Sequence, residues 1–156
     1  MTNRQCISSD SGALVELIPE LSQYKTLSNK IIAILDDVQK QLFYRSLKAK
    51  VLILKLASEI GGSQLFFYND LVFLCKYRIY IEDMYIREKY VGNEYYKTIL
   101  KSICQLVIEK YSHRVELLCL NWNKVSIDFY LKLVIKQISD WMNYRLDRKN
   151  IEKTAK

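Results

Sequence analysis

The sequence is short of the residues that build tight turns and metal sites, with four Gly, one Pro and one His among 156 residues. Folds made of many short strands need turn residues between them, so this shortage disfavours a multi-stranded β architecture. The four cysteines are widely spaced and form no Cys-x-x-Cys pair, which disfavours a structural zinc site. We therefore predict reduced cysteines, no bound metal and no cofactor.

Long hydrophobic runs are also missing. The longest unbroken aliphatic run is Val51-Leu52-Ile53-Leu54, whereas a membrane-spanning helix needs about 20 apolar residues. No apolar segment follows the polar first residues in the manner of a secretory signal. We predict an intracellular protein without a membrane span, in the cytoplasm or nucleus, or in the host cytoplasm if the protein is viral.

Apolar residues are plentiful. They make up 50% of the sequence, and charged residues make up 26%, which is an ordinary balance for a globular protein. A chain of this length suits one compact domain with its own core. We predict a single helical domain over residues 1–156, with frayed polar ends near 1–10 and 147–156.

The apolar residues recur at helical spacing. A stripe with intervals of three and four residues runs from Ile31 to Ile60, which indicates one long helix over 27–60. Similar patterns predict further long helices near 63–90, 93–112 and 126–146. The predicted fold is all-α, a single compact bundle of five or six helices. Its core is predicted to include Leu42, Ile53, Leu56, Ile103, Val134 and Trp141.

Catalytic patterns are sparse. Gly61-Gly62 is not followed by Lys-Ser or Lys-Thr, so it does not form a phosphate-binding loop. The acidic pairs Asp36-Asp37 and Glu82-Asp83 fall in predicted helices, where adjacent side chains point about 100° apart and do not converge on one atom. These observations predict that the protein is not an enzyme.

One segment suggests nucleic-acid binding. In Leu56–Ser63 a small residue, a glycine turn and a capping serine are spaced as in a helix-turn-helix. The stretch 34–68 resembles the DNA-binding segment of TetR-type regulators, which implies a degenerate helix-turn-helix at 54–72. The second helix of that motif would offer no Lys or Arg before Lys76, and phosphate contacts need such donors. A basic nucleic-acid-binding protein is therefore the second hypothesis.

A second resemblance concerns Asn121-Trp122-Asn123-Lys124-Val125. This stretch is similar to the Asn-Trp-Gly-Arg-Ile sequence that opens the central helix of Bcl-2-type death regulators. The resemblance implies a viral Bcl-2-like regulator of host signalling or apoptosis, with a hydrophobic groove beside Trp122. Asn replaces the Gly that allows close approach of a ligand, so this is the third hypothesis.

Aromatic and basic residues are interleaved in the middle of the chain, and the net charge is +7. Tyr and Arg together are typical of protein interfaces. The leading hypothesis is a non-catalytic interaction or assembly subunit that forms a homodimer or binds a protein partner through the predicted helix 63–90. Binding to nucleic acid should be weak and salt-sensitive. The predicted interaction residues are Tyr77, Arg78, Tyr80, Tyr85, Arg87, Tyr90 and Trp122.

Overall fold

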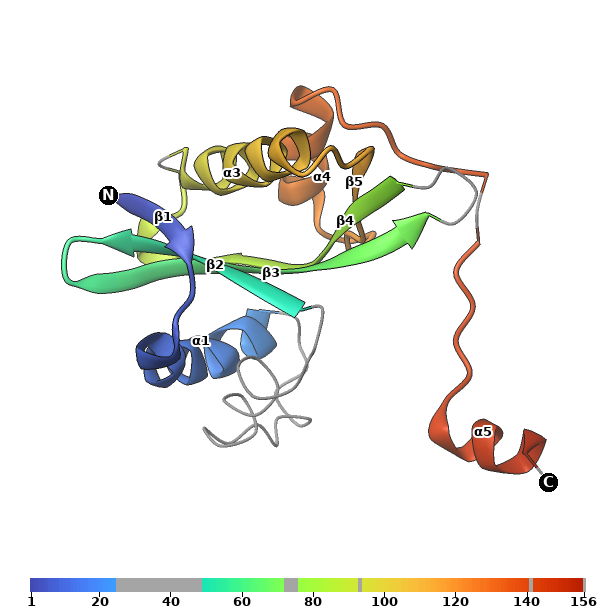
Figure 1. Cartoon of the computed structure of the whole chain (residues 1–156). Coiled ribbons are helices and arrows are strands. Elements are labelled where there is room, and N and C mark those ends of the chain that lie inside the picture. Colours follow the sequence, from blue (N-terminus) through green and yellow to red (C-terminus); the bar gives the residue numbers. More distant parts are fainter. Residues whose placement is uncertain (25–48, 72–75, 93, 141, 156) are drawn as a thin grey trace. The chain divides into compact units, whose positions relative to one another are not determined.

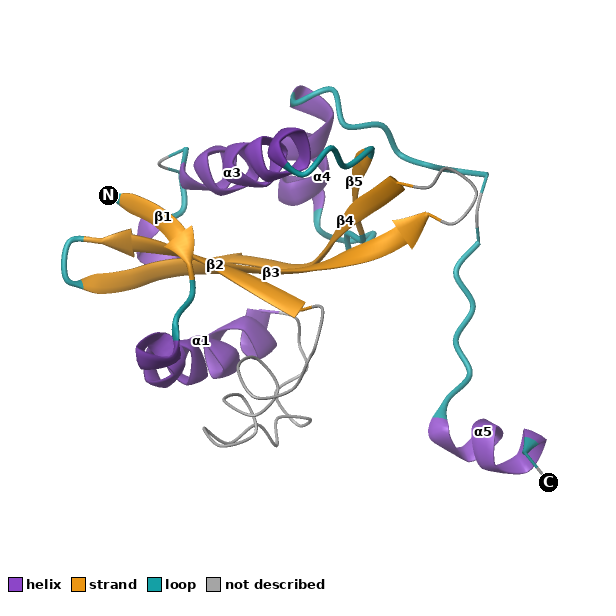
Figure 2. Cartoon of the chain, viewed as in Figure 1, coloured by secondary structure: helices purple, strands orange, loops and turns teal. Residues whose placement is uncertain are grey.

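The computed structural model describes residues 1–24, 49–71, 76–92, 94–140 and 142–155. These residues fall into two compact units, Met1–Leu118 and Cys119–Lys156. Figure 1 follows the chain along both units, and Figure 2 shows that the first contains both strands and helices. Among the described helices, none is long and apolar enough to cross a membrane.

A mixed sheet forms the centre of the first unit, so the all-α prediction is wrong. Its strands are β1 (Thr2–Gln5), β2 (Ala49–Leu56), β3 (Glu59–Leu71), β4 (Lys76–Ile86) and β5 (Arg114–Leu117). They lie in the order β1-β2-β3-β4-β5. The first four strands pair antiparallel, whereas β4 and β5 are parallel.

Two of the described helices cover the sheet. The helix α1 (Ser11–Tyr24) follows a short 3-10 turn, η1 (Ser8–Asp10), and α3 (Tyr95–Glu109) follows a second one, η5 (Glu88–Tyr90). Figure 1 shows α1 on one face of the sheet and α3 on the other. The second unit contains α4 (Lys124–Lys132) and α5 (Arg148–Thr154).

The helices α1 and α3 pack against two separate parts of the core. On one face, Leu14 and Leu17 of α1 pack with Val51, Ile53 and Tyr85 of the sheet. On the other face, Ile99 of α3 packs with a second cluster of sheet residues, which are Leu54, Leu56 and Ile86. The sheet therefore contributes apolar side chains to both faces, as expected for a sheet that is covered on both sides.

This two-sided burial explains why the strands look helical in the sequence. Six of the eight residues of β2 are buried, and the run does not alternate between apolar and polar. A continuous apolar run cannot be assigned to helix or strand from periodicity alone. The predicted helix 27–60 therefore contains β2, and its residues 27–48 lie outside the described part of the chain.

The other three predicted helices had different outcomes. The segment 63–90 contains most of β3 and all of β4, so the prediction of a helix there, apolar on every side at its start, is wrong. The prediction over 93–112 is confirmed by α3, which spans Tyr95–Glu109. Only the first part of 126–146 is helical, because α4 ends at Lys132.

The proposed helix-turn-helix is a β-hairpin. Ala57 and Ser58 form the turn between β2 and β3, and Ala57 adopts a positive φ of 53°. Gly61 and Gly62 lie inside β3 rather than at a helix end. An α-helix therefore does not occupy the position that the DNA-binding hypothesis requires.

The core predictions were partly confirmed. Ile53, Leu56 and Ile103 are buried, whereas Val134 is 83% exposed. Leu42 and Trp141 lie outside the described residues. At the ends that we expected to be frayed, residues 2–5 form β1 and residues 148–154 form α5.

Candidate active site

A β-bulge interrupts β4 close to its middle. Leu65 of β3 pairs with Asp83, and the next residue, Phe66, pairs with Ile81. Glu82 is therefore an extra residue that has no counterpart in β3. Bulges bend a strand and change the direction of its side chains, and they are over-represented beside active sites. Glu82 is exposed and Asp83 is half-buried.

The neighbouring strand β5 ends its pairing at the same place. It pairs with β4 only from Arg78 to Ile81. Beyond the bulge, the Arg87 amide donates to the Gly61 carbonyl at 2.9 Å, on the β3 side. The backbone N–H and C=O groups of successive residues in an antiparallel strand point alternately to its two edges. Those of Met84 and Ile86 therefore point to the β5 side of β4, beyond the residues with which β5 pairs. This stretch of β4 is an open edge to which an extended chain can bind.

The open edge leads directly to the start of α3. Gly92 and Glu94, which precede the helix, both have positive φ, of 95° and 54°. The first amides of a helix have no partner within the helix, and its dipole gives this end a partial positive charge. Such an end favours phosphate groups. Glu94 is the N-cap residue, but its side chain makes no capping hydrogen bond.

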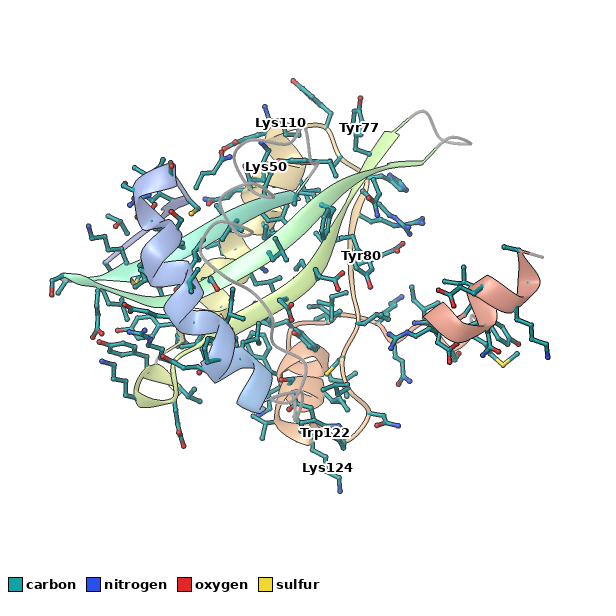
Figure 3. All side chains as sticks on the ribbon, turned by 90° about the horizontal axis from the view of Figure 1, so that it is seen from below. Lys50, Tyr77, Tyr80, Lys110, Trp122 and Lys124 are labelled. Atoms are coloured by element: carbon teal, nitrogen blue, oxygen red, sulfur yellow. The ribbon has the colours of Figure 1, made fainter. Side chains whose placement is uncertain are left out.

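The paired part of β4 and β5 carries a charged cluster. Arg78 lies beside Arg114, and Tyr80 lies beside Glu116, in the register of the two strands. Glu116 forms ion pairs with both arginines, to Arg78 Nη1 and to Arg114 Nε, the second at 2.5 Å. Figure 3 labels Tyr80 within this part of β4. Burial raises the pKa of the Tyr80 hydroxyl, and the nearby carboxylates of Glu82 and Glu116 raise it further.

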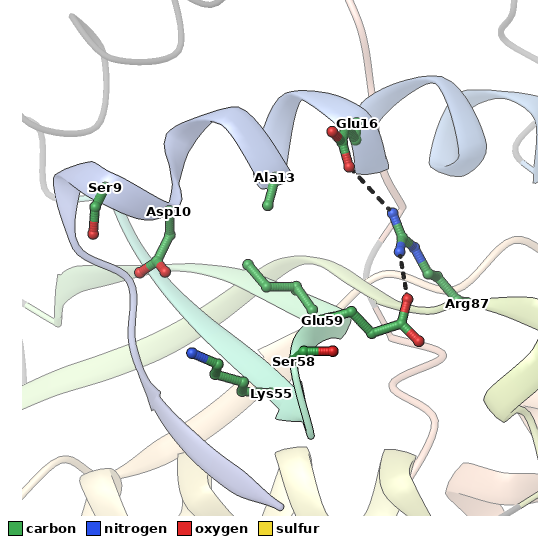
Figure 4. A pocket seen from close by; sticks show the side chains of 9 residues that line it. Ser9, Asp10, Ala13, Glu16, Lys55, Ser58, Glu59 and Arg87 are labelled. Atoms are coloured by element: carbon green, nitrogen blue, oxygen red, sulfur yellow. Dashed lines mark hydrogen bonds and ion pairs between the residues drawn. The ribbon is translucent and has the colours of Figure 1, made fainter.

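A second charged cluster holds the end of β4 in place. Arg87 contacts Glu20 at 3.2 Å, Glu59 at 3.3 Å and Glu16 at 3.8 Å. It therefore connects α1 to the β2–β3 hairpin, as Figure 4 shows for Glu16 and Glu59 beside a cavity of 270 Å³. Hydrogen bonds from Lys89 and Tyr90 lower the pKa of the Glu59 carboxyl. These contacts occupy the two terminal nitrogens of Arg87 and stabilise the fold, whereas its buried Nε has no hydrogen-bond partner within the described residues.

The predicted interaction residues do not form one surface. Arg78 and Tyr80 belong to the cluster on β4 and β5, whereas Arg87 and Tyr90 belong to the cluster around Glu59. Tyr85 is 8% exposed and donates a hydrogen bond to Glu20 at 3.1 Å. Burial and this bond raise the pKa of Tyr85 to about 12. The two remaining residues, Tyr77 and Trp122, are exposed, and Trp122 belongs to the second unit.

Sequence analysis missed Glu82, Glu94, Arg114 and Glu116. Glu82 and Asp83 were dismissed because adjacent residues diverge on a helix. In a bulge, however, two consecutive residues oppose one residue of the partner strand. Recognising β4 as a strand would have identified this acidic pair.

Comparison with known proteins decides the class of this molecule. The family model described as "Acetyltransferase (GNAT) family" matches residues 35–133. The chain belongs to the GNAT acetyltransferase family. This GNAT chain is an acyltransferase that uses an acyl-CoA, so the prediction of a non-catalytic interaction subunit is wrong. The match also spans 54–72 and Asn121–Val125, and it overturns the nucleic-acid-binding and Bcl-2-like hypotheses.

Individual relatives agree with the family assignment. The chain is 25% identical over 164 residues to thialysine N-epsilon-acetyltransferase of Sus scrofa, covering 97% of this chain and 95% of that protein. The corresponding enzyme of Caenorhabditis elegans is 24% identical, and the alignment covers 91% of this chain and 89% of that enzyme. L-ornithine N5-acetyltransferase of Arabidopsis thaliana is 32% identical over 87 residues, which are 56% of this chain and 38% of that enzyme.

Solved structures share the fold. An integron cassette protein from the mobile metagenome of V. cholerae superposes with a TM-score of 0.86, at 18% identity, over 99% of this chain and 97% of that one. An aminoglycoside acetyltransferase from an uncultured soil metagenomic sample gives a TM-score of 0.80, also at 18% identity. The superposition covers 94% of this chain and 96% of that one. At these identities the similarity shows the α/β GNAT fold alone.

The open edge suits the acyl-CoA that this family uses. The pantetheine arm of CoA contains amide groups, which can pair with the backbone of Met84 and Ile86 as an added strand would. The diphosphate is an anion, for which the start of α3 is suitable. Glu94 opposes this role, because its carboxylate lies at that end of α3, where it pairs with Lys97 at 3.6 Å.

Replacing Glu94 with glycine should tighten binding of free CoA about two- to fivefold. The variant removes a negative charge from the helix end that is suitable for the diphosphate, and charges at a helix end contribute about 0.3–1 kcal/mol. Glycine also adopts the positive φ without strain. Isothermal titration calorimetry with CoA measures the change. The matched control is Glu88→Gln, an exposed acid of η5, which should leave the Kd unchanged. Equal affinities of Glu94→Gly and the unaltered protein would contradict this prediction.

Proposed function

We propose that this acetyltransferase transfers an acetyl group to the terminal side-chain amine of a small amino acid of the ornithine and thialysine class. The similarity to thialysine acetyltransferases over almost the whole chain supports this substrate class. The observation that carries the proposal is the carboxylate of Glu82. It lies at the bulge, where β4 and β5 part, beside the edge that suits the acyl donor.

A terminal amine is protonated in water at neutral pH, since the pKa of such an amine is about 10.4. It must lose a proton before its nitrogen can attack an acyl group. An exposed carboxylate at the bulge can attract the ammonium group and accept this proton. Asp83 follows in the chain and adds a second carboxylate beside Glu82, which also favours a cationic substrate.

Acetyl-CoA supplies the acetyl thioester. In the transfer, a bond forms between the amine nitrogen and the acetyl carbon, and the bond between that carbon and sulfur breaks. One proton of the ammonium group passes to Glu82, and a second proton from nitrogen ends on the sulfur of free CoA. The chain's own contribution is to orient the donor along Met84 and Ile86 and to accept the first proton at Glu82.

A direct assay tests the proposal. The purified full chain is incubated with acetyl-CoA and with ornithine, lysine or thialysine, and mass spectrometry detects the acetylated amino acid. We expect acetylation of the side-chain amine in at least one of these amino acids. The aminoglycoside sisomicin serves as a comparison substrate. Acetylation of sisomicin without acetylation of any amino acid would overturn the proposal.

A further inference from the structure

The cluster at the paired end of β4 and β5 has one positive charge in excess. Arg78 and Arg114 are neighbours in register, and the strands of a sheet lie about 4.8 Å apart. Two guanidinium groups at this spacing repel each other unless an anion lies between them. Glu116 supplies one carboxylate, with one oxygen for each arginine. Two cations therefore share a single anion.

Both arginines keep donors that Glu116 does not use. The Nε atom of Arg78 is buried and has no hydrogen-bond partner in the described part of the chain. A buried donor without a partner is costly and indicates a missing acceptor. Arg114 contacts Glu116 through Nε, so this bond leaves its two terminal nitrogens unused, and its side chain is 45% exposed. Two parallel nitrogens of this kind match the two oxygens of a carboxylate.

The position of the arginines relative to Glu82 identifies the ligand. Arg78, Tyr80 and Glu82 follow one another at every second position of β4. Four residues of a strand span about 13 Å between Cα atoms, and the side chains of arginine and glutamate are long enough to narrow this gap. One end of this row can hold a carboxylate and the other can hold an ammonium group. An amino acid with a side-chain amine carries these two charges.

We propose that Arg114, held by Glu116 and assisted by Arg78, binds the α-carboxylate of the acceptor amino acid. The enzyme thereby selects an amino acid over the diamine that lacks this carboxylate. This inference rests on the proposed function, because it extends the same acceptor site. Arg114 is a specificity-determining residue that contacts the substrate away from the reacting amine.

Ornithine and 1,4-diaminobutane form a matched pair of substrates, because they differ only in the carboxylate. We expect the unaltered enzyme to prefer ornithine by about 10- to 100-fold in kcat/KM, which is the usual contribution of hydrogen bonds to a charged group. In Arg114→Gln this preference should disappear, through a higher KM for ornithine. The kinetics with 1,4-diaminobutane should remain the same. Arg114→Lys should recover part of the preference, because a lysine keeps the charge but not the paired nitrogens.

Lys101→Gln is the control for loss of one positive charge, since Lys101 is an exposed residue of α3. It should retain the preference of the unaltered enzyme. Equal kcat/KM for the two amines in the unaltered enzyme would overturn the role of Arg114. A loss of the same size on both amines in Arg114→Gln would also overturn it, because that result indicates structural damage.

Failure of this inference differs from failure of the proposed function. If both amines are acetylated equally, the role of Arg114 is wrong and the proposed function stands. If neither amine nor any other amino acid is acetylated, the proposed function is wrong. Calorimetric titration with ornithine then decides the role of Arg114. Binding that weakens at least tenfold in Arg114→Gln supports a carboxylate site, and unchanged binding overturns it.

Discussion

Replacing Glu82 with glutamine is expected to lower kcat for amine acetylation by about 100- to 10,000-fold, the usual contribution of a general base. Glutamine has nearly the same size and keeps the hydrogen-bonding shape, but it cannot accept a proton from an ammonium group. The KM for acetyl-CoA should stay the same, because we expect the donor to bind along the backbone of Met84 and Ile86 and not at Glu82. Steady-state kinetics with saturating amine and a varied concentration of acetyl-CoA measures both values.

The pH dependence of this variant provides a second measurement. At high pH a growing fraction of the amine is neutral without help from the enzyme, since its own pKa is about 10.4. The deficit of Glu82→Gln should therefore become smaller as the pH rises toward that value. A deficit that stays constant with pH would contradict a role for Glu82 in removing the proton from the ammonium group.

Two controls separate Glu82 from the acids around it. Glu88→Gln removes an exposed carboxylate from η5, and it should leave kcat unchanged. Asp83→Asn changes the neighbouring residue and should have a much smaller effect. A larger loss in Asp83→Asn than in Glu82→Gln would show that Asp83, and not Glu82, accepts the proton.

Replacing Gly62 with alanine is expected to lower the free energy of unfolding by about 1–3 kcal/mol, which is the usual cost of overpacking. A Cβ atom at this position would lie 2.6 Å from the carbonyl oxygen of Tyr85 and 2.5 Å from Cδ1 of Ile86. The first of these atoms is backbone and cannot move without shifting β4. Strands that approach this closely need glycine. Urea unfolding followed by circular dichroism measures the loss.

Gly12 is the matched control within the same chain. It lies in α1, and a Cβ atom there would meet no other atom within 4 Å. Gly12→Ala should raise the free energy of unfolding by about 0.5–1 kcal/mol, because alanine loses less backbone entropy in a helix. Equal stability of the two variants would show that Gly62 does not hold β4 close to β3.

The helix α3 could be predicted from the sequence because one of its faces is exposed. Ile99 and Ile103 are buried, whereas Lys97 and Lys101 are exposed. This contrast makes the helical period visible in the residues themselves. The burial of Ile53 and Leu56 could be predicted for a different reason. Apolar side chains tend to be buried whether they belong to a helix or to a strand.

The strands could not be recognised in this way. A strand with helices on both faces has apolar residues on both faces, so β2 shows no alternation. The spacing of its residues is then compatible with a helix as well. The scarcity of Gly and Pro was misleading too, because the β2–β3 turn is made by Ala57 and Ser58. Only the pairing of the strands distinguishes the two interpretations.

The sequence by itself determined the globular character, the basic charge and the position of α3. It also marked Arg78 and Tyr80 as residues of interest. Tertiary structure alone decided which residues lie beside them. Strand pairing places Arg114 beside Arg78, although the two are far apart in the sequence. The bulge gives β4 one residue more than β3 at Glu82 and Asp83. Contacts between distant residues depend on register, and register is a property of the assembled sheet that no local pattern contains.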